Sequence, residues 1–463
     1  MPAMAPSSAD SPEAPPLEHR PLAPDVLLTF ATKVAVVVLG ALSTIVIART
    51  LGPAGRGAVA VAFSIMTLLV QFGSLGLQSA NPYFVARNPR SIATVVLNTV
   101  LGCAGIGLVL AALALAAKLW FPASLRGLDW LDVAVVAIGV PALLAMHLLQ
   151  SVFLAEGRMR VYNGVELAGS LAVFIGLLVG LTVLHIGVLG AIMVMVGANW
   201  AMTLAFLALQ RSNLSRADRP DRILLARMLR YGFRIYLTTL MAYTVGRVNL
   251  IVVDSYLGPS QAGLYSVGVS LAEAMCLFPT VVAINLFPRI ARGASFEHSA
   301  MVFRALWVLF GLLCLITVPL ASPGITLLYG SSFTAAAQIY YWMLPGIFCY
   351  GMLNVLAYHF AGRGFPREAV LVWLPGLIVN FAILEIFLPG HQAYVAALAS
   401  TIAYVIVLAL HMRLFATEAR GYRVLLPRPR ELIQLADMLV DSAKASVSAR
   451  RKNIIADGAA SDA

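Results

Sequence analysis

Leu51-Gly52-Pro53-Ala54-Gly55-Arg56-Gly57 is a short polar corner between two long apolar runs of the chain. A second copy, Leu257-Gly258-Pro259-Ser260-Gln261-Ala262-Gly263, lies 257 − 51 = 206 positions later. Both copies read L-G-P-x-x-x-G, and each closes one apolar run and opens another. Glycine and proline favour a tight turn at such a corner. The repeat predicts a chain built from two similar halves.

The composition is that of an integral membrane protein. Hydrophobic residues make up 60% of the chain, charged residues only 11%, and the mean hydropathy is +0.88, whereas about a quarter of the residues in soluble proteins are charged. The apolar runs have the length, roughly twenty residues, that a helix needs to cross about 30 Å of hydrocarbon. We therefore expect an all-α membrane protein. The four cysteines lie within apolar runs without metal-ligand spacing, and we interpret them as small core residues.

Twelve transmembrane helices are predicted, six in each half. Their ranges are 26–48, 58–79, 92–117, 131–154, 163–184, 188–209, 231–256, 262–286, 301–321, 335–360, 368–388 and 393–414. The predicted organisation is a six-helix bundle at 25–210, a linker at 211–230 and a second six-helix bundle at 231–415. Residues 1–24, which show no signal-peptide pattern, and 416–463 are expected to be tails, the first of them disordered. Residues 219–230 mix arginine with apolar residues and resemble a helix lying on the membrane surface, and residues 431–442 are expected to lie there too.

The net charge of +11 follows the predicted topology. The connections after even-numbered helices are rich in arginine, for example Arg87 with Arg90, Arg158 with Arg160, and Arg363 with Arg367. The connections after odd-numbered helices carry only Arg49, Arg56, Lys118 and Arg126. By the positive-inside rule, both termini and the linker are cytoplasmic. The excess charge is therefore a topology signal, and no nucleic-acid partner is expected.

The repeat extends beyond the corner. Val85-Ala86-Arg87 matches Ile290-Ala291-Arg292, and Gly157-Arg158 matches Gly362-Arg363, at nearly the same offset. Because each half has an even number of helices, both halves enter the membrane from the same side. The two bundles are therefore predicted to be parallel repeats about an axis along the membrane normal, which would let them rock around a central site.

Motifs of known enzymes are missing from the sequence. It has no P-loop, H-E-x-x-H, C-x-x-C or G-x-S-x-G, and no large extracytoplasmic loop that could build an active site. We expect no enzymatic activity, no cofactor and no metal site. Without a nucleotide site, the energy for transport would come from an ion gradient, the membrane potential or the substrate gradient.

Arg247 is the clearest candidate for a binding residue. It lies slightly past the middle of the seventh predicted helix, where an ionisable side chain costs roughly 2.5 to 3.5 kcal/mol on insertion scales. At about 100° per residue, Tyr236, Tyr243, Thr244 and Asp254 fall on the same side of that helix. Such a polar stripe should face a wet interior, where arginine can bind phosphate oxygens. The alternative is a structural ion pair.

Four other charged residues are further candidates. Glu273, near the middle of the eighth helix, would either pair with Arg247 or bind a coupling cation. Lys33, in the first helix, would either line an anion-attracting cavity or extend to the membrane interface. Arg49 and Arg56 flank the first corner against the positive-inside trend, which makes them candidates for contact with an anion.

Two stretches resemble a known family. The first runs from Ala48-Arg49-Thr50-Leu51-Gly52-Pro53 to Gly57, followed by Gly73-Ser74-Leu75-Gly76-Leu77; it resembles the first two helices of polysaccharide and O-antigen flippases of the multidrug/oligosaccharidyl-lipid/polysaccharide exporter superfamily. The second, from Arg247-Val248-Asn249 to Ser266, looks like the matching stretch of the second half. The family often has aspartate where this chain has Asn249, a departure that argues against an ion-coupling role there.

The resemblance implies a flippase of the bacterial inner membrane. Its substrate would be an undecaprenyl-pyrophosphate-linked oligosaccharide, moved outward by alternating access for O-antigen or exopolysaccharide synthesis. Lys33 would meet the pyrophosphate on the cytoplasmic side, Arg247 would bind it deeper, and Glu273 would tune that site. Partners would be the lipid-linked sugar, membrane lipid, and a polysaccharide polymerase with its export machinery. Two alternatives stay open: a drug or cation antiporter of the same superfamily, and a membrane polysaccharide polymerase or ligase.

Overall fold

A computed structural model describes residues 22–88, 91–120, 125–217, 219–291, 296–362, 370–418 and 421, and these residues form helices and no strands. The elements are α1 (Leu22–Gly73), α2 (Leu77–Arg87), α3 (Ile92–Trp120), α4 (Trp130–Ala155), α5 (Met159–Thr182), α6 (Gly187–Leu209), α7 (Arg211–Ser215), α8 (Arg222–Leu257), α9 (Pro259–Met275), α10 (Leu277–Ala291), α11 (Phe296–Tyr329), η3 (Ser331–Phe333), α12 (Ala336–Gly362), α14 (Trp373–Phe387) and α15 (Tyr394–Glu418).

The number of membrane spans agrees with the sequence. Ten helices of the described chain are long and apolar enough to cross a membrane. One of them, Leu28–Gly73, has 46 residues and is kinked at Gly52, so it supplies two crossings. The apolar helix α14 is shorter, with 15 residues. Counting α1 twice and adding α14 gives twelve crossings, which confirms an all-α membrane protein.

The two corner glycines have the same unusual backbone. Gly52 has φ 66° and ψ −173°, and Gly258 has φ 82° and ψ 174°. This combination is essentially restricted to glycine, because a Cβ would clash. In both copies proline follows directly, where its fixed φ suits the start of a helix. The repeated sequence therefore encodes a repeated backbone turn.

The predicted helix at 58–79 is broken by a turn, so a single continuous helix was the wrong expectation there, whereas the predicted helix at 262–286 is interrupted at one residue within a single membrane span. In the first half, Leu75 (φ 45°) and Gly76 (φ 82°) form a left-handed turn that separates α1 from α2. In the second half, the break falls at Cys276, between α9 and α10. Pro279 is the third residue of α10, where proline needs no hydrogen-bond acceptor. Hydropathy cannot reveal such breaks, because the residues at them are apolar or small.

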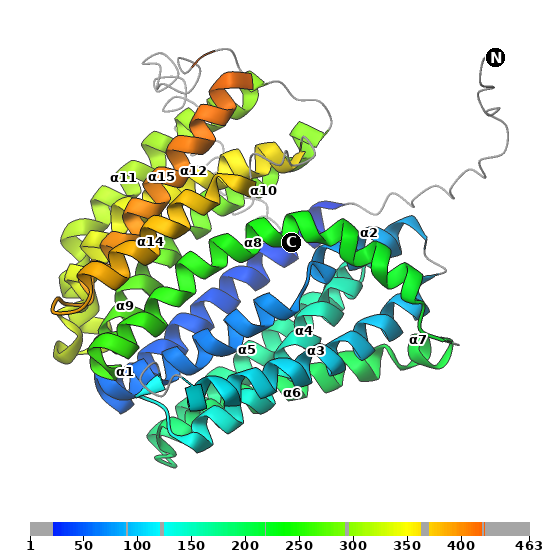
Figure 1. Cartoon of the computed structure of the whole chain (residues 1–463), viewed down its shortest axis with the longest axis horizontal. Coiled ribbons are helices and arrows are strands. Elements are labelled where there is room, and N and C mark those ends of the chain that lie inside the picture. The colour runs from blue at the N-terminus through cyan, green and yellow to red at the C-terminus, as the bar shows by residue number, and fades with distance from the viewer. Residues whose placement is uncertain are drawn as a thin grey trace, which may run out of the picture.

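Figure 1 shows α2 to α7 on one side of the molecule and α10 to α15 on the other, with α1, α8 and α9 between them. The helix α8 begins at Arg222, so residues 222–230, which the sequence assigned to the linker, continue the helix instead. Its first turn is capped by Asp221, which accepts hydrogen bonds from the backbone of Ile223 and Leu224. The segment predicted at 431–442 lies outside the described residues.

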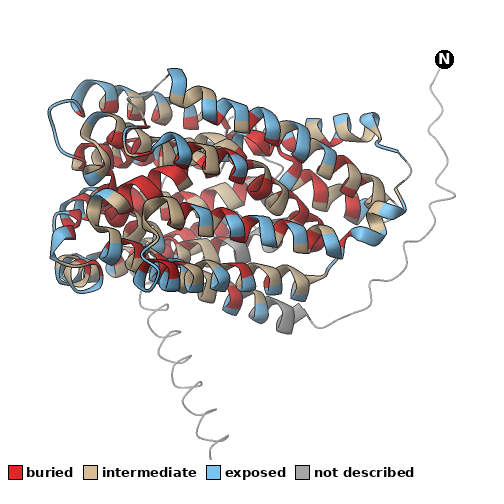
Figure 2. Ribbon diagram, turned by 90° about the horizontal axis from the view of Figure 1, so that it is seen from below, coloured by how far each residue is buried: buried red, intermediate tan, exposed pale blue. Residues whose placement is uncertain are grey.

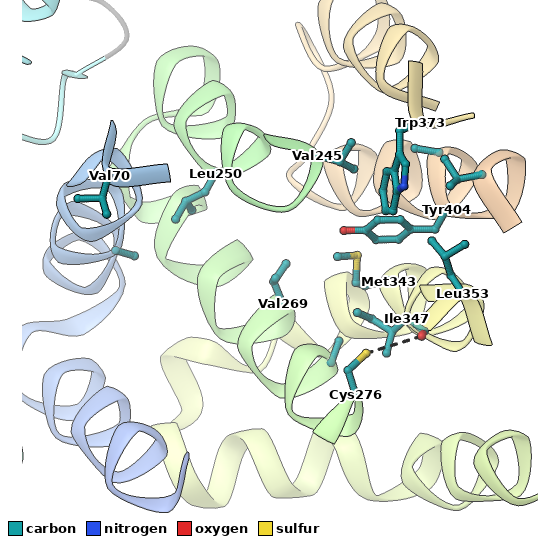
Figure 3. Packing of buried hydrophobic residues seen from close by; sticks show 14 of the residues in the cluster. Val70, Val245, Leu250, Val269, Cys276, Met343, Ile347, Leu353, Trp373 and Tyr404 are labelled. Atoms are coloured by element: carbon teal, nitrogen blue, oxygen red, sulfur yellow. Dashed lines mark hydrogen bonds between the residues drawn. The ribbon is translucent and has the colours of Figure 1, made fainter. Parts of the chain in front are cut away.

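Burial follows the helix faces (Figure 2), with buried residues gathered between helices and exposed ones around the outside. The outer surface carries large apolar side chains such as Leu108 (68% exposed) and Leu315 (69% exposed), as expected for helices that face lipid. Inside the second half, Tyr404 packs among Val245, Met343 and Trp373 (Figure 3). Three of the four cysteines are buried and Cys349 is half-buried; all are free, as the sequence predicts.

Candidate functional site

A cavity of about 430 Å³ lies between the two halves. The first half lines it with residues of α1, α4, α5 and α6, and the second half with residues of α8 and α9. Its charged lining residues are Arg56, Arg247 and Glu273. Polar groups surround them, among them Ser43, Thr44, Ser64, Thr67, His147, Asn199, Ser266 and Ser270. The sequence missed His147, although it is the only histidine in the fourth predicted helix. A mostly apolar cavity with a few charged and polar groups is the usual form of a ligand-binding site, and charged groups inside a membrane protein commonly mark a substrate path.

Arg247 and Glu273 meet in this cavity, which is one of the two alternatives that the sequence left open for Glu273. The Nη2 atom of Arg247 lies 3.5 Å from an Oε of Glu273. The guanidinium also lies over the ring of Tyr243, 5.6 Å from its centroid. Both charged side chains are partly exposed, at 30% and 36%. The pair is therefore long for an ion pair and partly accessible from the cavity.

Arg56 is the unpaired cation of the cavity. It lies one helical turn from Gly52, is 6% exposed, and its Nε has no hydrogen-bond partner. Within the described part of the chain no ion pair or hydrogen bond involves this side chain. A buried charge without a partner is costly, so an anion that entered the cavity would be stabilised here. The sequence made Arg56 a candidate for contact with an anion, but it could not show that this side chain is buried and lines the cavity.

Arg49 lies away from the cavity. Its Nε donates to the carbonyl of Leu328 at 2.7 Å, and its Nη2 donates to the carbonyl of Leu327. These carbonyls belong to the last turn of α11, where unsatisfied acceptors and the helix dipole favour a cation. Arg49 thus ties α1 in the first half to α11 in the second.

Lys33 is held by an ion pair inside the first half. Its Nζ lies 2.6 Å and 2.8 Å from the two oxygens of Glu166 on α5, and 3.3 Å from the hydroxyl of Tyr162. Lys33 does not line the central cavity, but Glu166 lines a smaller one of about 170 Å³ that shares His147 with it. The sequence missed Glu166. The available signal for this ion pair was that the predicted first and fifth helices carry charges of opposite sign, Lys33 and Glu166.

The end of the bundle that carries Gly52 and Gly258, here called the corner end, is tightly closed. A Cβ on Gly57 would lie 1.9 Å from the carbonyl oxygen of Pro259, and a Cβ on Gly263 would lie 1.9 Å from that of Pro53. The hydroxyl of Thr44 also lies 3.3 Å from that of Tyr329. These contacts join the two halves, which therefore pack directly against each other at the corner end.

The predicted polar stripe of α8 does not face the cavity throughout. Tyr236 donates to the carbonyl of Phe72 at 3.0 Å, at a contact between the two halves. Arg247 lines the cavity, whereas Asp254 is fully buried elsewhere. The stripe therefore follows the seam between the halves, and only its middle reaches the cavity.

Asn249 is the centre of a buried neutral network. Its side-chain amide donates to Asn380 at 3.1 Å, to Ser400 at 2.7 Å and to the carbonyl of Ala396 at 3.1 Å. Asn380 donates back at 2.8 Å. All three side chains are fully buried. Asn249 thus links α8, α14 and α15, and its partners are uncharged.

Comparison with known proteins identifies the family. The model of a family described as polysaccharide biosynthesis proteins matches residues 22–294, more than half of the chain. The chain belongs to this family. No curated protein sequence matches it.

Solved structures show the same fold. An inward closed form of the lipid II flippase MurJ matches with a TM-score of 0.69 at 12% identity, over 88% of this chain and 90% of that one. An inward-facing multidrug resistance MATE family transporter of the MOP superfamily matches with a TM-score of 0.67 at 13% identity, over 84% of this chain and 95% of that one. An outward-facing structure under the same description gives 0.53 at 14% identity, over 86% and 95%. The chain therefore has the fold of a family of membrane transporters and flippases.

Proposed function

We propose that this protein is a flippase that moves an undecaprenyl-pyrophosphate-linked oligosaccharide across the bacterial inner membrane by alternating access. Its membership of a polysaccharide biosynthesis family and its fold support a flippase or transporter. The finer proposal rests on one observation: two guanidinium groups, Arg56 and Arg247, line a single cavity at the junction of the halves, and Arg56 is unpaired. Arginine binds phosphate oxygens in bidentate fashion.

In this proposal each of the charged residues has its own part. Arg247 binds the pyrophosphate in exchange for Glu273, and Arg56 holds it at the closed end. Lys33 gives up its ion pair with Glu166 and binds the pyrophosphate nearer the cytoplasm. Arg49 supports closure of the corner end through α11 and does not contact the substrate in this arrangement.

The membrane orientation in this proposal follows the arginine pattern. Both termini are cytoplasmic, so the corner end faces the extracytoplasmic side and the described structure is closed there. The lipid tail of the substrate stays in the bilayer while the sugar and pyrophosphate cross through the cavity. A polysaccharide polymerase and export machinery would consume the delivered sugar for O-antigen or exopolysaccharide synthesis.

Substitution of Arg247 tests the proposal. Cells carrying Arg247→Ala should lose flipping of the lipid-linked sugar, measured as polymer at the cell surface and as lipid-linked sugar accumulating inside. Arg211→Ala is the matched control, since Arg211 is exposed on α7, away from the cavity. Unchanged flipping by Arg247→Ala, at normal protein level, would refute the central site.

A drug antiporter is the second candidate, because a MATE family transporter matches with a TM-score of 0.67. Glu273 is the only carboxylate among the lining residues of the cavity, and it faces Arg247. A cationic drug would therefore meet an excess of positive charge. Expression in a drug-sensitive host separates the two functions: the flippase leaves resistance to cationic dyes unchanged, whereas an antiporter raises it.

A further inference from the structure

Asp254 is buried at the corner end without a partner. It lies in the last turn of α8, is 0% exposed, and both of its carboxyl oxygens lack a hydrogen bond. Among the described residues it is the one carboxylate in this condition. Glu166 and Glu273, the other carboxylates deep in the bundle, face Lys33 and Arg247. Asp254 has no role in the substrate binding proposed above.

A loop of the first half covers this carboxyl. A Cβ on Gly127 would lie 3.2 Å from Oδ1 of Asp254 and 3.0 Å from the ring of Pro259. The backbone amide of Gly127 acts on this carboxyl, although neither carboxyl oxygen has a hydrogen bond of ordinary geometry. Lys118 holds the loop in place by donating to the carbonyls of Leu125 (2.7 Å) and Leu128 (2.6 Å). Asp254 is thus buried only while the two halves are together at this end.

The charged groups around Asp254 are few. Lys118 at the end of α3 and Arg126 in the covering loop are the cations that act on it, and neither forms an ion pair with it. Asp129 and Asp132, at the start of α4, lie near Lys118 and partly offset its charge. In the second half, Glu385 on α14 is engaged by the hydroxyl of Tyr256 at 2.6 Å. An ionised Asp254 would therefore be a buried anion without a direct partner, which is costly.

We propose that Asp254 is a proton-binding site that controls closure of the corner end. With a proton on one oxygen the side chain is neutral, and the loop at Gly127 can close over it. When the halves separate, water reaches the carboxyl and the proton leaves to the solvent on that side. The same proton returns from that side on closing, so the site senses external acidity and carries no proton across the membrane. This inference rests on the proposed alternating-access flippase.

Spin labels on the two halves test it without substrate. Leu184 (66% exposed), in the first half beyond α5, and Ile386 (67% exposed), on α14, are replaced by labelled cysteines in a Cys349→Ala background. The purified full chain in lipid nanodiscs should show the short distance at about pH 5 and a growing longer-distance population at about pH 9, because the proposed closure requires a proton on the buried carboxyl, and protons are scarcer at the higher pH. Asp254→Asn, which is always neutral, should keep the short distance at both.

Glu385→Gln removes an exposed carboxylate at the same end and should respond to pH as the wild type does. A wild-type distance that ignores pH overturns the inference even when Asp254→Asn fails to fold, and so does an Asp254→Asn distance that still responds. If the pH response is present while undecaprenyl-pyrophosphate-linked sugar is not moved, the proposed substrate fails and the proton site stands.

Discussion

Gly57 and Pro259 lie in backbone contact across the two halves, so close that a Cβ on Gly57 would stand 1.9 Å from the Pro259 carbonyl oxygen. Gly263 makes the same approach to Pro53. The last residue of each L-G-P-x-x-x-G copy must therefore be glycine, because the proline carbonyl of the other copy leaves no room for a Cβ. The corner is both a turn between two helices and the contact that closes the cavity.

Adding one methyl group at this contact should open the corner end. We expect Gly57→Ala and Gly263→Ala each to destabilise the closed state by about 1–3 kcal/mol, the usual cost of overpacking a rigid site. Thermal unfolding in detergent and the distance between the spin labels described above would measure it. Gly105→Ala is the control, since Gly105 is exposed and a Cβ there meets nothing within 4 Å. Equal behaviour of Gly57→Ala and Gly105→Ala would contradict the close contact.

Arg56→Gln should reduce flipping at least about tenfold, which corresponds to roughly 1.4 kcal/mol. The reason is that Arg56 is the unpaired cation of the cavity. The unfolding temperature should stay the same or rise, because a buried charge without a partner is removed. Arg49→Gln should instead lower stability through loss of its bonds to α11 while substrate affinity is retained. If Arg49→Gln lowered flipping and Arg56→Gln lowered only stability, the anion would bind at Arg49 and not at Arg56.

The ion pair between Lys33 and Glu166 allows a test of the role of Lys33. If Lys33 contacts pyrophosphate, Glu166→Gln should retain flipping, while Lys33→Gln should lose it whether alone or combined with Glu166→Gln. If the pair is purely structural, the double variant should recover what each single variant loses. Flipping of lipid-linked sugar in proteoliposomes, with protein amounts matched, distinguishes the two outcomes.

Asn249→Leu should destabilise the second half by about 1–3 kcal/mol, because it leaves buried Asn380 and Ser400 without their partner. Asn380→Leu should have a similar effect, and the double variant should cost less than the sum of the two. Chemical unfolding in mild detergent measures this coupling. Since the network is neutral, sodium should not change the unfolding of the wild type; a strong stabilisation by sodium would contradict it.

The repeat and the twelve crossings could be predicted from sequence, because spacing and hydropathy are properties of a single chain, whereas the Arg247–Glu273 pair was one of two alternatives for Glu273. The contacts within the candidate site could not be predicted in the same way. A helical wheel gives the direction of a side chain but not its neighbours. Asp254 and Arg247 share one stripe on α8, yet Asp254 is buried between the halves and Arg247 lines the cavity. Arg56 and Glu166 depend on contacts between helices far apart in sequence.

The reciprocal contact of Gly57 with Pro259 and of Gly263 with Pro53 has the form of an isologous interface, in which the same patch meets itself. Homodimers with two-fold symmetry are joined in this way. Either half alone carries both the glycine and the carbonyl that the contact needs, and could offer them to another copy of itself. The architecture is thus the one expected if a gene for a six-helix homodimer had been duplicated and fused, after which each copy of the corner was free to acquire its own charges.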